Sequence, residues 1–352
     1  MSKAVDDWAK MKYGRSISEE ELRKRTHPAW PYIHFKPGKP VDPAKVDEIL
    51  EGVIDLHLHG APLGGWLAGR PRMTDTCIEA SRAGMKALVF KDHNTMTNNC
   101  ADIIQDFLGR MELEARAKGE SFTPVEVYGG IVLNETIGGL NPRAVEVCLG
   151  YGRCKEVWLP SLDAAHQLQA MERDGGIRVS DGSGELVPEL IKILELLHDY
   201  NSNSKQDRCS LSTCHVSNEE KADILRYVKT RDMNIDVMLD HVTQEMTNLT
   251  PSEAKEMIDL GGYLQFAQCS CIPWPGMQDW VIAFDYSFKL IKELIAEKGP
   301  EQLILITDAG QPGNEPVAGW RMFIKTLLSQ GVGEAEINVM SKDVPQRILY
   351  GN

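Results

Sequence analysis

The fold is indicated most directly by residues 53–59, which read Val-Ile-Asp-Leu-His-Leu-His. An apolar, β-branched start is typical of a strand that is buried on both faces. Residues two apart on a strand point to the same side. The stretch therefore predicts a buried strand whose end carries His57 and His59 on one face, with Asp55 on that face too.

Seven similar runs follow, and amphipathic stretches separate them. This alternation is typical of repeated βα units around a parallel sheet. Eight such units in a chain of 352 residues, 42% of them hydrophobic, predict a (β/α)8 TIM barrel. The expected strands are 53–57, 86–91, 125–133, 156–160, 209–213, 235–241, 262–266 and 303–307. The expected helices are 75–83, 103–118, 142–149, 188–201, 219–230, 251–260, 279–297 and 317–329.

Two segments fall outside this repeat. Residues 1–45 combine a charged stretch over 18–24 with five prolines between 28 and 43, and we interpret them as an N-terminal arm before a barrel over 46–352. The arm's aromatic residues pack on a neighbouring subunit, beside the entrance of the site or over their own barrel, and we expect a homo-oligomer. Residues 175–184 contain the glycines and the Asp-Gly pair of a hairpin turn, which predicts a hairpin insertion after the fourth strand.

The charge balance bears on the partners. Lys and Arg total 38 against 51 Asp and Glu, a formal net charge of -13, which repels phosphate backbones and anionic lipids. We therefore expect a small-molecule substrate, with neither nucleic acid nor a membrane as partner. The N-terminal residues lack a signal or transit composition, so the expected location is the cytoplasm. The eight cysteines lack CxxC spacing, so neither a disulfide framework nor a cysteine zinc site is expected.

Metal-ligating residue types stand at the ends of four expected strands. His57 and His59 end the first, His215 follows the fifth, His241 ends the sixth and Asp308 follows the eighth. Active sites of TIM barrels lie at the C-terminal strand ends, so these residues should converge on one rim. Imidazoles and a carboxylate suit Zn²⁺ and also Mn²⁺, Fe²⁺ or Ni²⁺. The pattern predicts about one or two divalent ions per chain, with an open position for water.

Lys91 ends the second expected strand, where an ammonium would face a metal-binding rim. Three roles remain open for it: a carbamate formed with CO₂ that bridges two metals, a cation that binds an anionic substrate, and a structural lysine. His93 shares its orientation by the two-residue period and is a candidate substrate contact or ligand. Asn134 after the third strand and Trp274 after the seventh are candidate substrate contacts in loops at the same rim.

The histidine pair on the first strand, the histidines on the fifth and sixth and the aspartate on the eighth resemble the amidohydrolase superfamily of metal-dependent barrels. The likeness covers about residues 46–350. Residues 53–62, 129–142 and 212–217 further resemble a bacterial subfamily of unassigned function, related to phosphotriesterase-like and amidohydrolase-like enzymes.

The resemblance implies that His57, His59 and Asp308 bind the more buried metal, while His215 and His241 bind the second. In better-known members a lysine or glutamate from a later strand bridges the metals. Residues 158–161 at the end of the fourth strand read Trp-Leu-Pro-Ser and contain neither. Either Lys91 takes over this role or the site holds one metal.

The resulting hypothesis is metal-assisted hydrolysis of an amide, cyclic amide, lactone or phosphoester, with Asp308 taking the proton of the attacking water. Decarboxylation of a small aromatic or unsaturated acid is the alternative among enzymes. A catalytically inactive barrel that acts as a binding protein is the alternative outside them.

Overall fold

Eight parallel strands are hydrogen-bonded in chain order from β1 to β8 in the computed structural model. The structure describes residues 38–63, 69–181, 183–203, 207–244, 246–272 and 284–351. The strands are β1 (Ile54–Leu58), β2 (Ala87–Phe90), β3 (Glu126–Val132), β4 (Cys154–Trp158), β5 (Ser210–Ser212), β6 (Val237–Leu239), β7 (Tyr263–Ala267) and β8 (Leu303–Ile306). Each bound lies within two residues of the range expected from the sequence.

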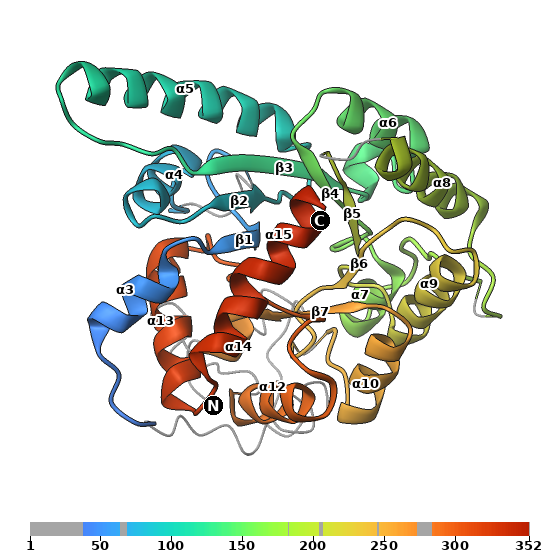
Figure 1. The fold of residues 1–352 in the computed structure, drawn as a ribbon. Coiled ribbons are helices and arrows are strands. Elements are labelled where there is room, and N and C mark those ends of the chain that lie inside the picture. Colours follow the sequence, from blue (N-terminus) through green and yellow to red (C-terminus); the bar gives the residue numbers. More distant parts are fainter. Residues whose placement is uncertain are drawn as a thin grey trace.

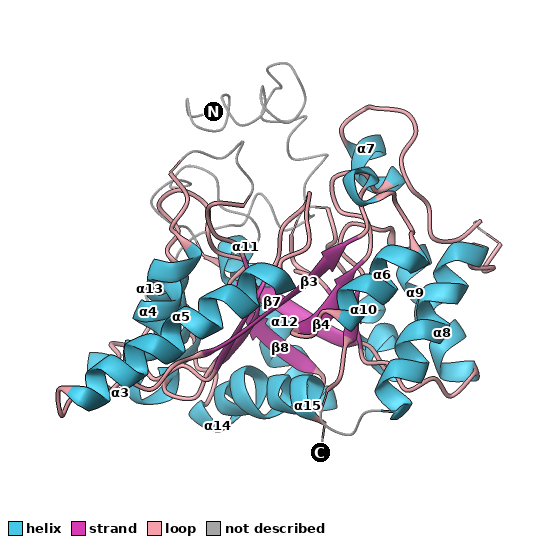
Figure 2. Ribbon diagram, turned by 90° about the horizontal axis from the view of Figure 1, so that it is seen from above, coloured by secondary structure: helices cyan, strands magenta, loops and turns pink. Residues whose placement is uncertain are grey.

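The ring closes where β1 and β8 end. The Asp308 amide donates to the His57 carbonyl at 2.8 Å, and the His59 amide donates to the Ala309 carbonyl at 2.7 Å. Helices surround the strands (Figures 1 and 2). The predicted (β/α)8 barrel is therefore confirmed.

The eight expected helices form, and shorter ones join them. The expected set is α4 (Met73–Arg82), α5 (Asn98–Ala117), α6 (Pro142–Gly150), α8 (Pro188–Asn203), α9 (Asn218–Thr230), α10 (Pro251–Asp259), α12 (Phe284–Lys298) and α13 (Pro316–Ser329). The others are α3 (Pro43–Leu50), η2 (Glu135–Ile137), α7 (Ala165–Ala170), α11 (Gln268–Cys271), α14 (Glu334–Asn338), η4 (Val339–Asp343) and α15 (Val344–Tyr350). Within the described ranges, no helix combines the length and apolar character that a membrane span requires.

The barrel interior is apolar at one end and polar at the other. Ile54 and Leu56 of β1 pack inside the ring with Ile304 and Ile306 of β8. Apolar residues of α15 join this cluster: Val344, Ile348 and Leu349. Figure 2 shows α15 at one end of the barrel and α7 at the other. The helix α15 covers the end of the barrel where the strands begin. The polar side chains lie at the opposite end, at the carboxyl ends of the strands.

The insertion after β4 contains α7 and a turn. The turn is held by an antiparallel bridge between Ser180 and Leu186 and by the Asp181 amide, which donates to the Glu185 carbonyl at 3.0 Å. The expected hairpin is thus reduced to an isolated bridge. Of the expected N-terminal arm, residues 1–37 lie outside the described part, and its last residues already belong to α3.

The expectation that Asp55 faces the barrel mouth with His57 and His59 is wrong. The pairing of β1 with β2 shifts register between Asp55 and Leu58, which breaks the two-residue alternation. Asp55 instead accepts a hydrogen bond at 2.8 Å from Trp320 of α13 in the helix layer, and one at 2.5 Å from the Thr307 hydroxyl. Asp55 is therefore a structural acceptor that ties β1 to β8 and α13.

Candidate metal centre

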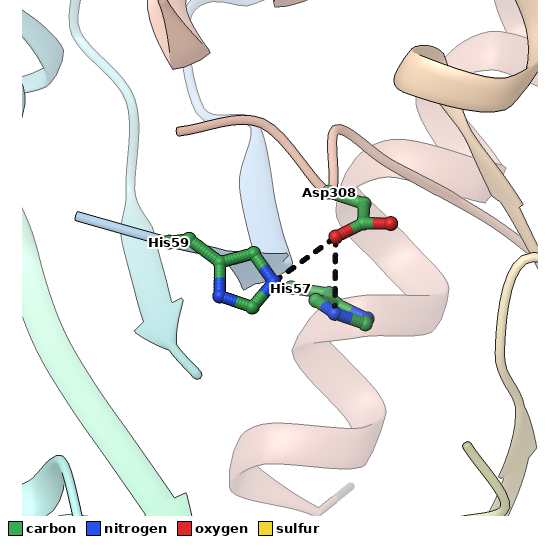
Figure 3. A group of neighbouring side chains, drawn as sticks. All are labelled: His57, His59 and Asp308. Atoms are coloured by element: carbon green, nitrogen blue, oxygen red, sulfur yellow. Dashed lines mark hydrogen bonds and ion pairs between the residues drawn. The ribbon is translucent and has the colours of Figure 1, made fainter. Parts of the chain in front are cut away.

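Three buried side chains from β1 and the end of β8 meet at the carboxyl end of the barrel (Figure 3). His57 Nε2 lies 3.4 Å and His59 Nε2 3.1 Å from Asp308 Oδ1. One ligand atom from each residue lies within 4.8 Å of the others. This group has the donor types and the spacing of a divalent metal site.

His241 and His215 extend the group across the barrel. The rings of His57 and His241 lie 5.9 Å apart between centroids, and those of His241 and His215 lie 5.1 Å apart. All the histidines expected at the rim are therefore neighbours in space. His57 and His59 form a close group with Asp308, and His215 and His241 form a pair beside it.

The backbone is strained at three of these strand ends. Cys214, His241 and Asp308 have φ of 47°, 33° and 47°, in the left-handed region that non-glycine residues seldom adopt. Such conformations cluster at functional sites because the surrounding structure must hold them. Here they turn the chain so that His215, His241 and Asp308 lie over the barrel mouth.

Two of the histidines are oriented by hydrogen bonds at Nδ1. The Nδ1 atom of His215 lies 2.8 Å from Gln167 Oε1, and that of His241 lies 2.9 Å from Thr247 Oγ1. The Thr247 hydroxyl donates its own hydrogen to the His241 carbonyl. Both acceptors therefore take a proton from Nδ1, which leaves the Nε2 lone pair free.

His57 follows the same pattern with a carboxylate. Its Nδ1 faces Asp240 Oδ1 at 3.3 Å, while its Nε2 is directed at Asp308. Metal-ligating histidines in proteins commonly use the second nitrogen in this way. Neither ring nitrogen of His57 has a hydrogen-bond partner within the described part of the chain. A bound cation would satisfy the Nε2 atom.

The charge states also suit a metal. Burial lowers the pKa of His59 to about 4 and that of His241 to about 3, and it holds the pKa of His215 well below its usual value. Burial opposes ionisation of Asp308, but His57 and His59 hold its pKa well below the usual range. At neutral pH, His59, His215 and His241 are therefore neutral imidazoles and Asp308 is a carboxylate, as metal binding requires.

Lys91 directly follows β2 at the carboxyl end of the strand and is 1% exposed. Its Nζ is 3.9 Å from Asp240 Oδ1 and 5.8 Å from the centroid of the Trp158 ring. Burial acts to lower the pKa of Lys91, but Cys214, Asp240 and Asp308 raise it above its ordinary value. The residue at the end of β4, where a bridging lysine or glutamate would be expected from the resemblance, is Trp158.

His93 is positioned by a hydrogen-bond network at the same rim. Its ring stacks on that of His59 at 5.2 Å, and its Nδ1 lies 2.8 Å from Ser161 Oγ. Asn134 donates to Ser161 Oγ at 2.9 Å. The Ser161 oxygen can accept from both Asn134 and His93, so the direction of its hydrogen bond to His93 Nδ1 depends on the tautomer of the ring. Burial keeps the pKa of His93 well below the usual value.

The other two predicted substrate contacts differ in position. Asn134 is 1% exposed, and its oxygen accepts from the Ser161 and Asp163 amides while its nitrogen donates to Ser161 and the His93 carbonyl. The structure thus gives Asn134 a part in orienting His93, and a direct substrate contact remains a prediction. Trp274 lies outside the described residues.

Sequence reasoning missed the residues that orient the ligands. Gln167 comes from α7 in the insertion, and Thr247 follows β6 in a loop. Asp240 precedes His241 directly, and its position at a strand end was the one signal available. Cys269 of α11 also contacts the site, because its thiol donates to Asp308 Oδ2 at 3.3 Å.

Solved structures of other proteins share the barrel fold of this chain. Among solved structures, a mutant of a PTE-like lactonase from Deinococcus radiodurans has a TM-score of 0.55 and 14% identity, and the match covers 88% of this chain and 98% of that one. The organophosphorus hydrolase from Deinococcus radiodurans has a TM-score of 0.54 and 13% identity, with 89% and 96% covered. The resemblance expected from the sequence is confirmed at the level of fold: the chain shares its barrel fold with these two proteins.

The chain belongs to the family described as "Family of unknown function (DUF6282)", whose model matches residues 52–265. This range contains every candidate ligand except Asp308. No curated protein matches the sequence.

Proposed function

We propose that this protein is a metal-dependent hydrolase that cleaves a lactone or a phosphoester in a small molecule. The observation that carries the proposal is the convergence of four histidines and one carboxylate, with His215 and His241 oriented by hydrogen bonds at Nδ1. The fold shared with a lactonase and an organophosphorus hydrolase supports the same bond types.

The residues present fit a divalent ion such as Zn²⁺. His57, His59 and Asp308 would hold the more buried ion, and His215 and His241 a second one. When bound, the metal acidifies water and polarises the scissile carbonyl or phosphoryl group. The orphaned nitrogen atoms of His57 in the described structure agree with this assignment.

Two side chains are suited to the proton movements. Asp308 accepts the proton of the attacking water and passes it to the leaving group, and the Cys269 thiol helps to fix the orientation of its carboxylate. His93 has a pKa held well below the usual value by burial, and in the tautomer with its proton on Nε2 it would donate a hydrogen bond to the oxygen that gains negative charge. Ser161 and Asn134 hold its ring in place for this.

Lys91 is proposed to bridge the two ions as a carbamate. Its buried Nζ lies 3.9 Å from Asp240 Oδ1, the carboxylate that also faces His57, which supports a role at the metal centre. A carbamate forms from the neutral amine, so the raised pKa of Lys91 opposes its formation, and bound divalent cations would favour it. The alternative is an ammonium that binds an anionic substrate.

Replacement of Lys91 by alanine separates these roles. We expect the variant to lose about one ion per chain and to regain part of it with bicarbonate and a short carboxylic acid. Elemental analysis is the measurement, and Lys155→Ala, which removes another buried lysine, controls for general destabilisation. Unchanged metal content with a raised KM for an anionic substrate alone would assign Lys91 the cationic role.

The proposed reaction is tested by product analysis. The Zn²⁺-loaded protein is incubated with matched lactones, phosphotriesters and amides, and with unsaturated and aromatic acids. We expect a new hydroxy acid or a phosphodiester and an alcohol, formed only with metal present. Release of CO₂ from an acid without hydrolysis of any member would replace the proposal with a decarboxylase. Stoichiometric metal without turnover of any substrate would favour a binding protein.

A further inference from the structure

Arg70 is a buried cation with unused hydrogen-bond donors. The residue is 8% exposed, and both Nε and Nη1 are buried without a hydrogen-bond partner in the described part of the chain. Burying a guanidinium without partners costs free energy, so native proteins retain such groups where something else satisfies them. The unused donors therefore indicate a ligand.

The position of Arg70 connects it to the candidate metal centre. It lies between β1 and α4, at the rim, where its charge acts on His59 and His93. Asp92 and Asp308 are the carboxylates whose charges raise the pKa of Arg70 against the effect of burial. Asp308 is occupied by His57, His59 and Cys269.

Asp92 does not take up the guanidinium either. Its Oδ1 accepts from the Asn94 amide at 2.9 Å, while its Oδ2 is buried without a hydrogen-bond partner in the described structure. The Arg70 donors and this carboxylate oxygen are thus both buried and without a hydrogen-bond partner in the described structure.

We propose that Arg70 binds an oxyanion of the substrate, a carboxylate or a phosphate, while the metal centre acts on the neighbouring bond. This inference rests on the proposed function and narrows its substrate to molecules with an anionic substituent. The planar fork of a guanidinium matches two oxygens of such a group. Because the protein carries a formal net charge of -13, an anionic substrate needs a local cation to offset the general repulsion.

The experiment measures binding by calorimetry, in Zn²⁺-loaded and in chelator-treated protein. The probes are succinate, inorganic phosphate and the neutral analogue succinamide. We expect Arg70→Gln to weaken succinate or phosphate binding by about ten- to hundred-fold, the contribution of charge-assisted hydrogen bonds. The stronger of the two anions identifies the oxyanion. Succinamide should bind weakly and equally to both proteins.

Two further variants control the result. Arg72→Gln removes an exposed arginine two residues away and should leave anion binding unchanged. Arg70→Lys keeps the charge without the fork and should bind the anion with intermediate strength. If Arg70→Gln does not fold, Arg70→Lys is the variant whose anion binding is compared with that of the wild type. Thermal unfolding adds an independent readout: loss of an unpaired charge should not lower the midpoint.

The outcomes are distinct. Equal anion binding by wild type and Arg70→Gln, or by wild type and Arg70→Lys if only that variant folds, overturns the inference. A large fall in the unfolding midpoint of Arg70→Gln with unchanged anion binding makes Arg70 structural. Binding that depends on Arg70 in a protein that hydrolyses nothing supports the inference and contradicts the proposed function, because binding needs no turnover. Hydrolysis of neutral substrates alone, with no anion binding that depends on Arg70, supports the proposed function and contradicts the inference about Arg70.

Discussion

Replacement of Asp308 by asparagine is expected to lower kcat by about 10²–10⁴-fold in protein that keeps its metal. The amide has the size of the carboxylate but cannot accept the proton of the attacking water. His57, His59, His215 and His241 remain as ligands, so metal can be restored by adding Zn²⁺ in excess. Kinetics over a range of pH, with metal content measured on the same sample, provide the test.

The pH profile separates the two functions of Asp308. If it is the base, the acidic limb of the wild-type profile should disappear or shift in the variant. A metal-loaded variant with near-normal kcat and the same acidic limb would show that the base lies elsewhere, with His93 as the next candidate. Loss of activity that is recovered fully by added Zn²⁺ would limit Asp308 to ligation.

Replacement of His57 by alanine is expected to remove at least one ion per chain and to abolish activity. His57 is fully buried, and its two nitrogens face Asp308 and Asp240, so no other side chain can move into its place without repacking. The variant also removes one neighbour each from Asp308 and Asp240. Elemental analysis and hydrolysis of the best substrate are measured together.

His198→Ala is the matched control for this variant. His198 lies on α8 and accepts from the Asn234 amide at 2.8 Å, away from the strand ends. The His198→Ala variant should retain wild-type metal content. Full metal content in folded His57→Ala would contradict the ligand assignment for β1.

The sequence predicted the strands because each is a short apolar run between turn residues. It also predicted which histidines meet, since a parallel barrel brings the carboxyl ends of its strands to one rim. The face of Asp55 could not be predicted from alternation, because the register of β1 shifts between Asp55 and Leu58. The sequence did not predict α15, because its few apolar residues can be recognised as core residues only once they are seen to line one end of the barrel.

The residues that orient the site were less accessible to prediction. Gln167 and Thr247 are polar residues in an insertion and a loop, and only the folded chain brings them to His215 and His241. For Arg70 the informative feature is the lack of a partner for Nε and Nη1. A sequence pattern contains no sign of which buried donors remain unused.

The most direct test of the account is the metal content of the purified protein, measured by elemental analysis before chelation, after it, and after reconstitution with Zn²⁺. The account predicts about one or two zinc-like ions per chain, loss of hydrolysis when they are removed, and recovery of hydrolysis when they are restored. Protein that holds no stoichiometric metal, or whose full activity survives exhaustive chelation, would contradict it.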